Sequence, residues 1–239
     1  MNKYIALIPY YNHPDTIAKV VHHLLSQSLP CLIIDDGSNE AGLKALEPLK
    51  AIDQVTIMYR EQNGGKGAAV KTGLEKAQAL GYTHAIQVDA DAQHNLQDLK
   101  TFIQYADQHP DALILGHPQY DHTAPKSRLY GRKITNFWVA INTCSLDIKD
   151  AMCGFRLYPL SLIKRLNLAK IGDRMEFDIE ILIKLHWEKA TFIWVPTQVT
   201  YEENGVSHFK ALKDNLLISS MHARLFFTML ARLITGKGV

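Results

Sequence analysis

The sequence predicts an α/β fold in which helices flank a mainly parallel sheet. Through the first half of the chain, short apolar runs typical of buried strands alternate with segments of helical periodicity. Strands joined by helices of 10–15 residues form right-handed crossovers, and therefore parallel pairs. The chain has 239 residues, 47% of them hydrophobic, so it can bury the core of one such domain and carry a short appendage.

The expected elements follow one another closely up to residue 116. The strands cover 3–9, 31–38, 55–61, 83–91 and 111–116, and the helices cover 15–28, 66–81 and 96–110. Asp15 is the expected N-cap of the first helix, because its carboxylate can accept a backbone N–H of the first turn. Gly81 is expected to close the second helix, since glycine readily adopts the left-handed conformation that ends helices.

Composition argues against several classes of protein. The net charge is only +2, which does not suit a dedicated nucleic-acid binder. The first twelve residues carry one lysine and a short apolar stretch interrupted by Pro9, unlike a secretory signal. Cys31, Cys144 and Cys153 are odd in number and widely spaced, as is usual for reduced thiols. We therefore expect a cytoplasmic protein that binds no nucleic acid.

Polar clusters follow three of the expected strands. Residues 9–12 follow the first strand, residues 35–38 the second and residues 89–91 the fourth. In parallel α/β sheets, ligands bind outside the carboxyl ends of the strands. These clusters are therefore expected to form one site.

The third cluster has the side chains of a metal site. On an extended chain, residues two apart point the same way, so Asp89, Asp91 and Gln93 would present three oxygen ligands together if the strand continues that far. Such oxygens suit Mg²⁺ or Mn²⁺, which leaves coordination positions for the phosphates of a substrate. A polar strand end without a metal is the alternative.

A glycine-rich segment at 63–69 opens the helix that begins at Lys66. Backbone N–H groups at a helix start, together with the lysine, can bind phosphate. The segment lacks the spacing of a P-loop, and a glycine turn with a solvated lysine is the other interpretation.

Four segments together resemble the family 2 glycosyltransferases. They are IPYYNHPDTI, IIDDGSNE, NGGKGAAVKTGLEKA and VDADAQH, and their spacing is most similar to the branch that resembles dolichol-phosphate mannose synthase. The likeness continues through KDAMCGFRLYP and RMEFDIEILIKL and covers about residues 3–209. Ordered motifs of this kind are far more specific together than any one of them.

The resemblance implies a GT-A fold, a Rossmann-like arrangement. It also implies a nucleoside-diphosphate-sugar donor, either a GDP- or a UDP-sugar, and a metal-dependent transfer with inversion at the anomeric carbon. By position in the motifs, the donor nucleotide would lie against Pro9, Tyr11, Asn12, Asp35, Asp36, Lys66, Asp89 and Ala90. The metal, Mg²⁺ or Mn²⁺, would be bound by Asp89, Asp91 and Gln93.

The chain departs from the family pattern at three positions. Ala92 replaces the usual glycine of D-A-D-G-Q-H, which matters if this residue needs a positive φ. Glu202 stands where the branch often has an arginine that serves phosphate, and His208 replaces a lysine. Two membrane-associated acceptors therefore stay open, a polyprenyl phosphate and a lipid-linked hydroxyl.

The two acceptors differ in whether they need a base. A phosphate oxygen is already anionic, whereas a hydroxyl must lose its proton to a carboxylate within hydrogen-bond reach. Asp150 is the first candidate, followed by Glu176 and Asp178; each of them could instead be a paired or solvated carboxylate, Asp150 for example with Arg156. The residues expected in catalysis are thus Asp91, Asp150 and Glu176. Those expected to bind the acceptor or its phosphate are Arg128, Arg132, Arg156 and His208.

The last thirty residues form a separate segment in this interpretation. Residues 1–209 would be the glycosyltransferase domain, and 210–239 one or two amphipathic helices that combine basic and apolar side chains. Such helices lie in the membrane interface, or they pack on the domain or on a second subunit of a homodimer. We expect peripheral attachment to the inner face of the cell membrane.

Two other functions are compatible with an α/β sheet that binds phosphate. A nucleotidyltransferase that makes nucleotide sugars should carry a glycine loop after its first strand, and IPYYNHPDT has none. A noncatalytic module that binds a nucleotide sugar or a lipid would not need Asp89, Asp91 and Gln93 intact. Sugar transfer is therefore the expected function.

Overall fold

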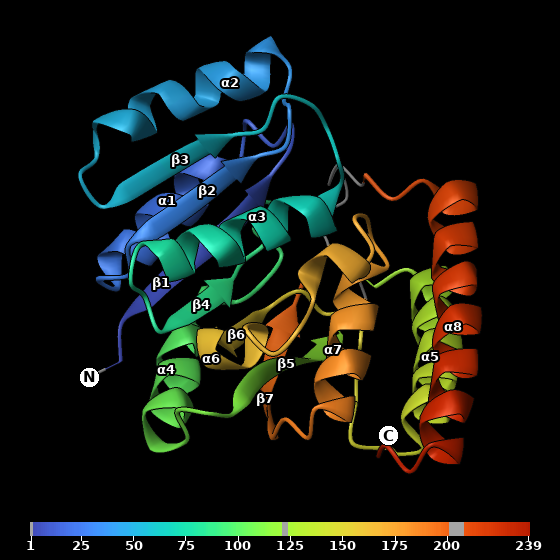
Figure 1. Cartoon of the computed structure of the whole chain (residues 1–239). Coiled ribbons are helices and arrows are strands. Elements are labelled where there is room, and N and C mark those ends of the chain that lie inside the picture. Colours follow the sequence, from blue (N-terminus) through green and yellow to red (C-terminus); the bar gives the residue numbers. More distant parts are fainter. Residues whose placement is uncertain (1, 121–123, 201–207) are drawn as a thin grey trace.

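The computed structural model describes residues 2–120, 124–200 and 208–239. Its centre is a seven-stranded sheet with the strand order β3-β2-β1-β4-β6-β5-β7 (Figure 1). The strands are β1 (Tyr4–Tyr10), β2 (Cys31–Asp35), β3 (Val55–Tyr59), β4 (His84–Gln87), β5 (Leu113–Tyr120), β6 (Arg156–Pro159) and β7 (Phe192–Val199). Only β6 runs against its neighbours, β4 and β5. The predicted α/β class with a mainly parallel sheet is confirmed.

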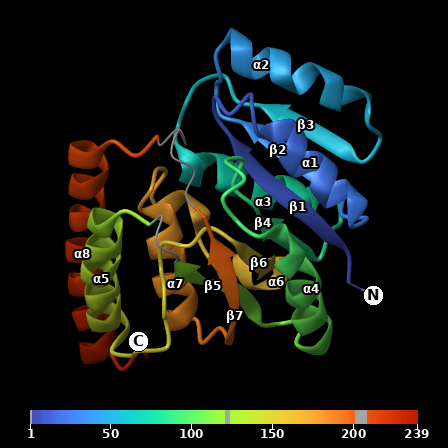
Figure 2. The same cartoon turned by 180° about the vertical axis from the view of Figure 1, so that it is seen from behind.

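Helices cover both faces of this sheet. α3, α6 and α7 pack on one face, and α1 and α4 pack on the other, as the opposite view in Figure 2 shows. The helices are α1 (Ile17–Ser26), α2 (Glu40–Leu46), α3 (Lys66–Ala79), α4 (Leu99–Gln108), α5 (Lys126–Thr143), α6 (Leu160–Ile163), α7 (Phe177–Trp187) and α8 (Ala211–Ile234).

The side-chain alternation of β1 explains the two layers. Ile5 and Leu7 point into the core beneath α3 and α7, whereas Ala6 and Ile8 point into the core beneath α1 and α4. The first layer is close to the sheet because α3 is rich in small residues. A Cβ at Gly73 would collide with the side chain of Leu7.

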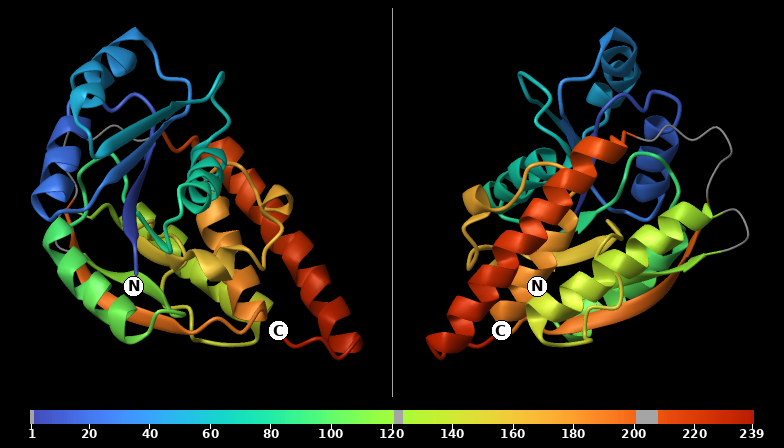
Figure 3. Two further views of the ribbon diagram at one scale, coloured as in Figure 1. Left: turned by 60° about the vertical axis from the view of Figure 1, so that its left-hand side comes forward. Right: turned by 90° about the vertical axis from the view of Figure 1, so that its right-hand side faces the viewer.

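α5 and α8 lie side by side outside α7 (Figures 1 and 3). The C-terminal segment is thus a single helix, whose buried residues include Ile218, Met221 and Leu225. Two ion pairs fix its inner face to the domain. Arg224 Nη2 lies 2.8 Å from Glu180 Oε2, and Arg174 Nε lies 3.1 Å from Asp214 Oδ1.

Several predicted boundaries differ from the structure. The prediction of Asp15 as an N-cap is wrong, because α1 begins at Ile17 and Thr16 occupies the N-cap position. The Thr16 hydroxyl does not cap the helix either; it donates to the carbonyl of Ala90 at 2.5 Å. Gly81 does close α3, with φ 78° and a hydrogen bond from its N–H to Gln78 O.

Candidate active site

A cavity of about 860 Å³ opens at the edge of the sheet where β1, β2 and β4 end. Its lining includes residues from all three polar clusters at this edge, and α5 and α8 supply the opposite wall. The lining residues that the sequence singled out for the donor or the metal are Pro9, Tyr11, Asn12, Asp36, Lys66, Asp89, Ala90, Asp91 and Gln93. The fold therefore brings most of the predicted donor residues together.

The glycine-rich turn is held in place by Asp36. The carboxylate accepts backbone N–H groups of Gly64 at 3.0 Å and Gly65 at 2.7 Å, and it pairs with Arg60 at 2.5 Å. Burial raises the pKa of Asp36, and the two backbone donors and Arg60 oppose that effect. Asp35 is also buried but is absent from the cavity lining; it accepts the N–H of Ser38 instead. Both carboxylates thus shape the loops around the site.

The loop after β1 is tied to the loop after β2. The side-chain oxygen of Asn12 accepts the N–H of Asn39 at 2.8 Å, and the hydroxyl of Ser38 accepts the N–H of Asn12 at 3.0 Å. Tyr11 contacts the ring of His208, with centroids 5.0 Å apart, and His13 contacts the same ring at 4.9 Å. This aromatic cluster forms part of the cavity wall.

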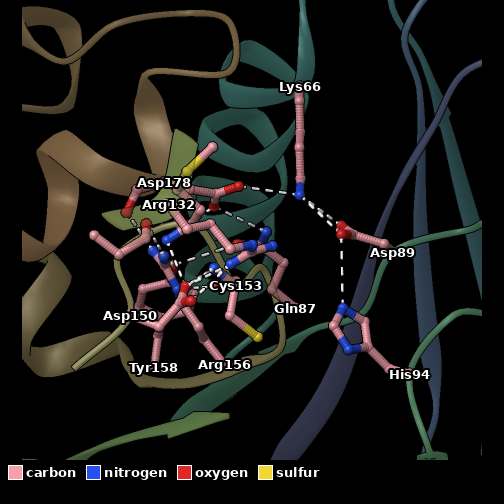
Figure 4. Close-up of polar contacts among 12 residues, drawn as sticks. Lys66, Gln87, Asp89, His94, Arg132, Asp150, Cys153, Arg156, Tyr158 and Asp178 are labelled. Carbon is pink, nitrogen blue, oxygen red and sulfur yellow. Dashed lines mark hydrogen bonds and ion pairs between the residues drawn. The ribbon is translucent and has the colours of Figure 1, made fainter. Parts of the chain in front are cut away.

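Lys66 is shared between two carboxylates (Figure 4). Its Nζ atom lies 2.8 Å from Asp89 Oδ1, 2.9 Å from Asp89 Oδ2 and 3.0 Å from Asp178 Oδ2. Burial opposes the charge of Lys66, but both carboxylates raise its pKa above the usual range. Burial also opposes ionisation of Asp89, but Lys66 and the nearby His94 hold the pKa of its carboxyl well below its usual range.

Asp91 and Gln93 line the cavity beyond Asp89, although the expected extended strand is wrong. β4 ends at Gln87, and the chain then turns, with Ala92 at φ 59°. Asp91 Oδ1 accepts the N–H of Gln93 at 3.1 Å, which stabilises this turn. Burial raises the pKa of Asp91, and the charge of Asp89 raises it further. A cation bound nearby would stabilise the ionised form of a carboxylate in this environment.

The side-chain oxygens of Asp89, Asp91 and Gln93 suit a metal ion that also binds the phosphates of a substrate. Among the described residues, no three side chains of the His, Cys, Asp or Glu type are arranged to hold an ion. Mg²⁺ usually takes only one or two carboxylates from the protein and completes its shell with phosphates and waters. Asp91, with Asp89 and Gln93 in the same cavity wall, fits that pattern.

Met152, Cys153 and Gly154 line the cavity just before β6 begins. A Cβ at Gly154 would stand 2.6 Å from Lys66 Nζ and 2.9 Å from Asp89 Oδ2. Arg156, predicted to bind the acceptor, is instead fully buried and is absent from the cavity lining. Its guanidinium donates to the carbonyls of Cys153, Ala151 and Asp178, so its five donors serve the protein interior.

None of the three candidate bases, Asp150, Glu176 and Asp178, lines the cavity. Asp150 is buried and pairs with Arg132 at 2.7 Å, not with Arg156, and it accepts the N–H groups of Met152 and Cys153 at 2.8 Å each. Glu176 is also buried, just before the first residue of α7, and accepts the N–H of Arg174 at 3.3 Å. The contacts of Asp150 are those of a structural group. Glu176 differs, because its buried Oε2 has no hydrogen-bond partner among the described residues.

Basic side chains also line the cavity. Arg128 and Arg132 reach it from α5, Arg174 from the loop before α7, and Lys210 from the start of α8. His208, a member of the aromatic cluster, lines the cavity as well. Glu202, the other departure in this region, lies outside the described residues. The cavity lining thus combines carboxylates with cationic side chains.

Three residues that contribute to the site have roles that the sequence does not predict. Asp178 is predicted there as a candidate base, and no role is assigned to His13 or Gln87. Asp178 had one usable signal, because a carboxylate inside the apolar run FDIEILI must be buried with a partner. The partner itself, Lys66, is 112 positions away in the chain and is brought close only by the fold.

Comparison with protein families gives a clear match. Residues 5–166 fit the family model described as glycosyl transferase family 2. The UDP-N-acetylglucosamine–dolichyl-phosphate N-acetylglucosaminyltransferase of Methanococcus voltae is 28% identical, across 84% of this chain and 87% of that protein. The polyprenol monophosphomannose synthase of Mycolicibacterium smegmatis is 27% identical, across 85% of this chain and 79% of that protein.

Solved structures share the fold at lower identity. Glucosyl-3-phosphoglycerate synthase from Mycobacterium tuberculosis, crystallised with Mn²⁺ and UDP-glucose, superposes with a TM-score of 0.67 and 14% identity, across 97% of this chain and 79% of that one. S. aureus TarS in complex with UDP-GlcNAc has a TM-score of 0.66 and 17% identity, and 93% of this chain covers 66% of that one. At this level of identity, the similarity concerns the arrangement of the sheet and its helices.

Proposed function

Because this chain belongs to glycosyl transferase family 2 and has the GT-A fold, we propose that it transfers a sugar from a nucleoside diphosphate to a polyprenyl phosphate. The donor would be a GDP- or UDP-sugar, the divalent cation Mg²⁺ or Mn²⁺, and the stereochemical outcome inversion. The names of the relatives support the acceptor, since they act on dolichyl or polyprenol phosphates.

The observation that carries the proposal is the presence of carboxylates and basic side chains in one cavity. Asp89 and Asp91 line it, and so do Arg128, Arg132 and Lys210. Paired carboxylates suit a donor diphosphate that arrives with a divalent cation. Basic side chains suit a second anion. A cavity of about 860 Å³ is large enough to hold both reacting groups.

The positions of the candidate bases support a phosphate acceptor over a hydroxyl. Asp150 is engaged by Arg132 and two backbone N–H groups, and Glu176 is buried outside the cavity lining. A hydroxyl acceptor would need a carboxylate near its oxygen, whereas a phosphate oxygen can attack without losing a proton. Asp150 would then act through Arg132, by orienting its guanidinium toward the acceptor phosphate.

In the proposed reaction, a phosphate oxygen of the acceptor attacks the anomeric carbon while the bond to the diphosphate oxygen breaks. Direct displacement from the opposite face gives inversion. Lys66, Asp91 and Gln93 would hold the donor end, and Arg128 and Arg132 would orient the acceptor. When bound, the divalent cation supplies positive charge to the departing diphosphate.

The outer surface of α5 and α8 supports attachment to a membrane. Both helices expose large apolar side chains: Tyr130, Ile134, Phe137 and Trp138 on α5, and Leu212, Leu216, Phe227, Leu230, Leu233 and Ile234 on α8. We call these residues the outer apolar face. Lys126 and Arg128 on α5 and Lys210 and Lys213 at the start of α8 add positive charge at the end near the cavity, as suits anionic head groups.

α8 fits a helix that lies on the membrane better than one that crosses it. By length and composition it could span a bilayer, with a mean hydropathy of 1.3. Its inner side, however, carries Asp214 and Arg224 in ion pairs with the domain, and His222 is buried. Crossing the bilayer would break these pairs and bury their charges in hydrocarbon, which is costly. The outer apolar face would instead rest at the interface, on the cytoplasmic side as expected from the sequence.

Product analysis tests the proposal. Purified chain would be incubated with GDP- or UDP-sugars, Mn²⁺ and either a polyprenyl phosphate or the matching polyprenol. Release of nucleoside diphosphate with the phosphate acceptor, and its loss in EDTA, is the expected result. Release only with the polyprenol would overturn the acceptor, and formation of pyrophosphate would indicate a nucleotidyltransferase instead. A thermal-shift panel of the donors identifies the base, because a bound ligand raises stability.

A further inference from the structure

We propose that Lys66 occupies the cation position at Asp89 when no divalent ion is bound, and that Asp178 is a positioning residue that keeps Lys66 paired when the ion displaces it. This inference rests on the metal-dependent transfer proposed above. It concerns side chains on three separate elements: α3 with Lys66, the segment after β4 with Asp89, and α7 with Asp178.

The distances show that the ammonium already fills the space where an ion would bind Asp89. Both carboxylate oxygens lie within 2.9 Å of Nζ. Among the described residues, the next cationic or ionisable donor to Asp89 is His94, whose Nε2 lies 3.9 Å from Oδ2. A divalent cation that binds Asp89 must therefore compete with Lys66 for the same oxygens (Figure 4).

Asp178 is fixed much more firmly than Asp89. Its Oδ1 accepts Gln87 Nε2 at 3.1 Å and lies 3.7 Å from Arg156 Nη1, and its Oδ2 holds Lys66 at 3.0 Å. These partners come from β4, β6 and α3, so the carboxylate cannot follow the ammonium if the ammonium moves. Asp178 does not line the cavity, whereas the proposed metal ligands Asp89, Asp91 and Gln93 do.

The carboxylate of Asp178 keeps the buried charge of Lys66 paired. Lys66 is largely buried, and a buried ammonium that loses its partner carries a desolvation penalty of several kcal/mol. If Asp89 were its only partner, binding of an ion would leave that charge unpaired. With Asp178 already in contact, Lys66 stays paired while Asp89 turns toward the ion. The exchange therefore needs only a small movement of one side chain.

Binding of Mn²⁺ alone, followed by the electron paramagnetic resonance signal of the free ion, tests this inference. The Lys66→Met variant keeps an unbranched side chain that is one atom shorter and removes the competing charge. It should bind Mn²⁺ about tenfold more tightly than the unaltered chain, which is the scale expected from loss of one close charge. A misfolded variant would bind Mn²⁺ more weakly, so tighter binding by Lys66→Met cannot result from misfolding.

Asp178→Asn should change the affinity in the opposite direction. Without its second partner, Lys66 depends on Asp89 alone, and Mn²⁺ should bind about threefold or more weakly. Arg132→Met is the matched control, since Arg132 lines the same cavity but pairs with Asp150. It should leave the affinity within about twofold of the unaltered chain.

Two results would overturn the inference. One is Lys66→Met binding Mn²⁺ no more tightly than the unaltered chain, and the other is Arg132→Met tightening binding as much as Lys66→Met does. Neither measurement involves sugar transfer. If the variants show this pattern of Mn²⁺ affinities but the chain transfers no sugar, only the proposed function is wrong. If the chain transfers sugar with Mn²⁺ but the variants lack the pattern, only this inference is wrong.

Discussion

Gly154 lies directly against the ammonium of Lys66, so that a Cβ at residue 154 would stand 2.6 Å from Nζ. The same atom would also crowd Asp89 Oδ2 and Gln87 Nε2, at 2.9 and 3.0 Å. A methyl group at residue 154 would therefore force the ends of these paired side chains to shift.

Gly154→Ala should push Lys66 and Asp89 apart and disturb the donor end of the site. We expect kcat/KM to fall about 10²-fold, the scale associated with misplacing reacting groups by about 1 Å. The thermal shift produced by the donor should shrink in parallel. Gly131→Ala is the control, because a Cβ there meets no atom within 4 Å. If Gly154→Ala binds donor normally, the steric argument is wrong.

Ala92→Gly should stabilise the protein. Ala92 has φ 59°, a left-handed conformation that costs an L-residue about 1–2 kcal/mol and a glycine almost nothing. After the greater flexibility of glycine in the unfolded chain is subtracted, a gain of about 1 kcal/mol remains. Urea unfolding measures it. Ala90→Gly, two residues earlier, lacks the positive φ and removes a buried methyl group, so it should lower the midpoint.

Asp91→Asn should abolish transfer and yet raise stability at neutral pH. Burial and the charge of Asp89 raise the pKa of Asp91 above its ordinary value of 3.8. The native state then binds more protons than the unfolded state between the two values, so this group lowers stability as pH rises through that window, and the penalty is complete above it. A lower unfolding midpoint at pH 7 in the variant would contradict this account, and near-normal turnover would refute the metal assignment.

His222→Gln should reduce the acid sensitivity of the chain. His222 lies between α8 and α5, where its Nδ1 is 3.0 Å from Asn142 Nδ2, and burial lowers its pKa to about 4. The unfolded chain takes up a proton near pH 6.5 that the native protein does not, so stability falls as pH drops from about 6.5 toward 4. Between pH 7.5 and 5 this group should cost about 1–2 kcal/mol. Urea midpoints of both proteins across this range would measure the difference.

Ile134→Glu combined with Phe227→Glu should weaken sedimentation with anionic vesicles. Both side chains are on the outer apolar face and exposed, so the change removes apolar contact and adds negative charge at the surface proposed to meet lipid. Leu43→Glu is the matched control, since Leu43 is an exposed leucine on α2, distant from α8 (Figure 1). If the double variant sediments as fully as the unaltered chain, another surface binds the membrane.

The first half of the fold could be predicted from periodicity, whereas β6 and β7 could not. β6 has only four residues, all of them buried, and it ends at Pro159. A run that short shows neither alternation nor helical period, and its direction is set by its neighbours β4 and β5 rather than by its own sequence.

The position of most residues expected to bind the donor could be predicted, because the ends of parallel strands meet at one edge. The positions of the residues expected to bind the acceptor were harder to predict. Arg156 and Asp150 have the right chemistry for binding and proton transfer, yet their partners are Asp178 and Arg132, which are distant in sequence. Whether a charged side chain faces a cavity or a buried partner depends on tertiary contacts, which sequence spacing does not reveal. Whether the chain forms a homodimer stays a prediction.

The reversal of β6 brings the two strands that flank α5 to the same edge of the sheet. Strand β5 ends at the ligand edge and β6 begins there, so α5 belongs to a connection whose flanking strands both lie beside the cavity. The half of the sheet expected to bind the nucleotide, from β1 to β4, lies outside this connection. Exchanging α5 for that of a relative, together with the side chains of α7 and α8 that pack on it, would therefore test whether this connection sets the proposed acceptor preference.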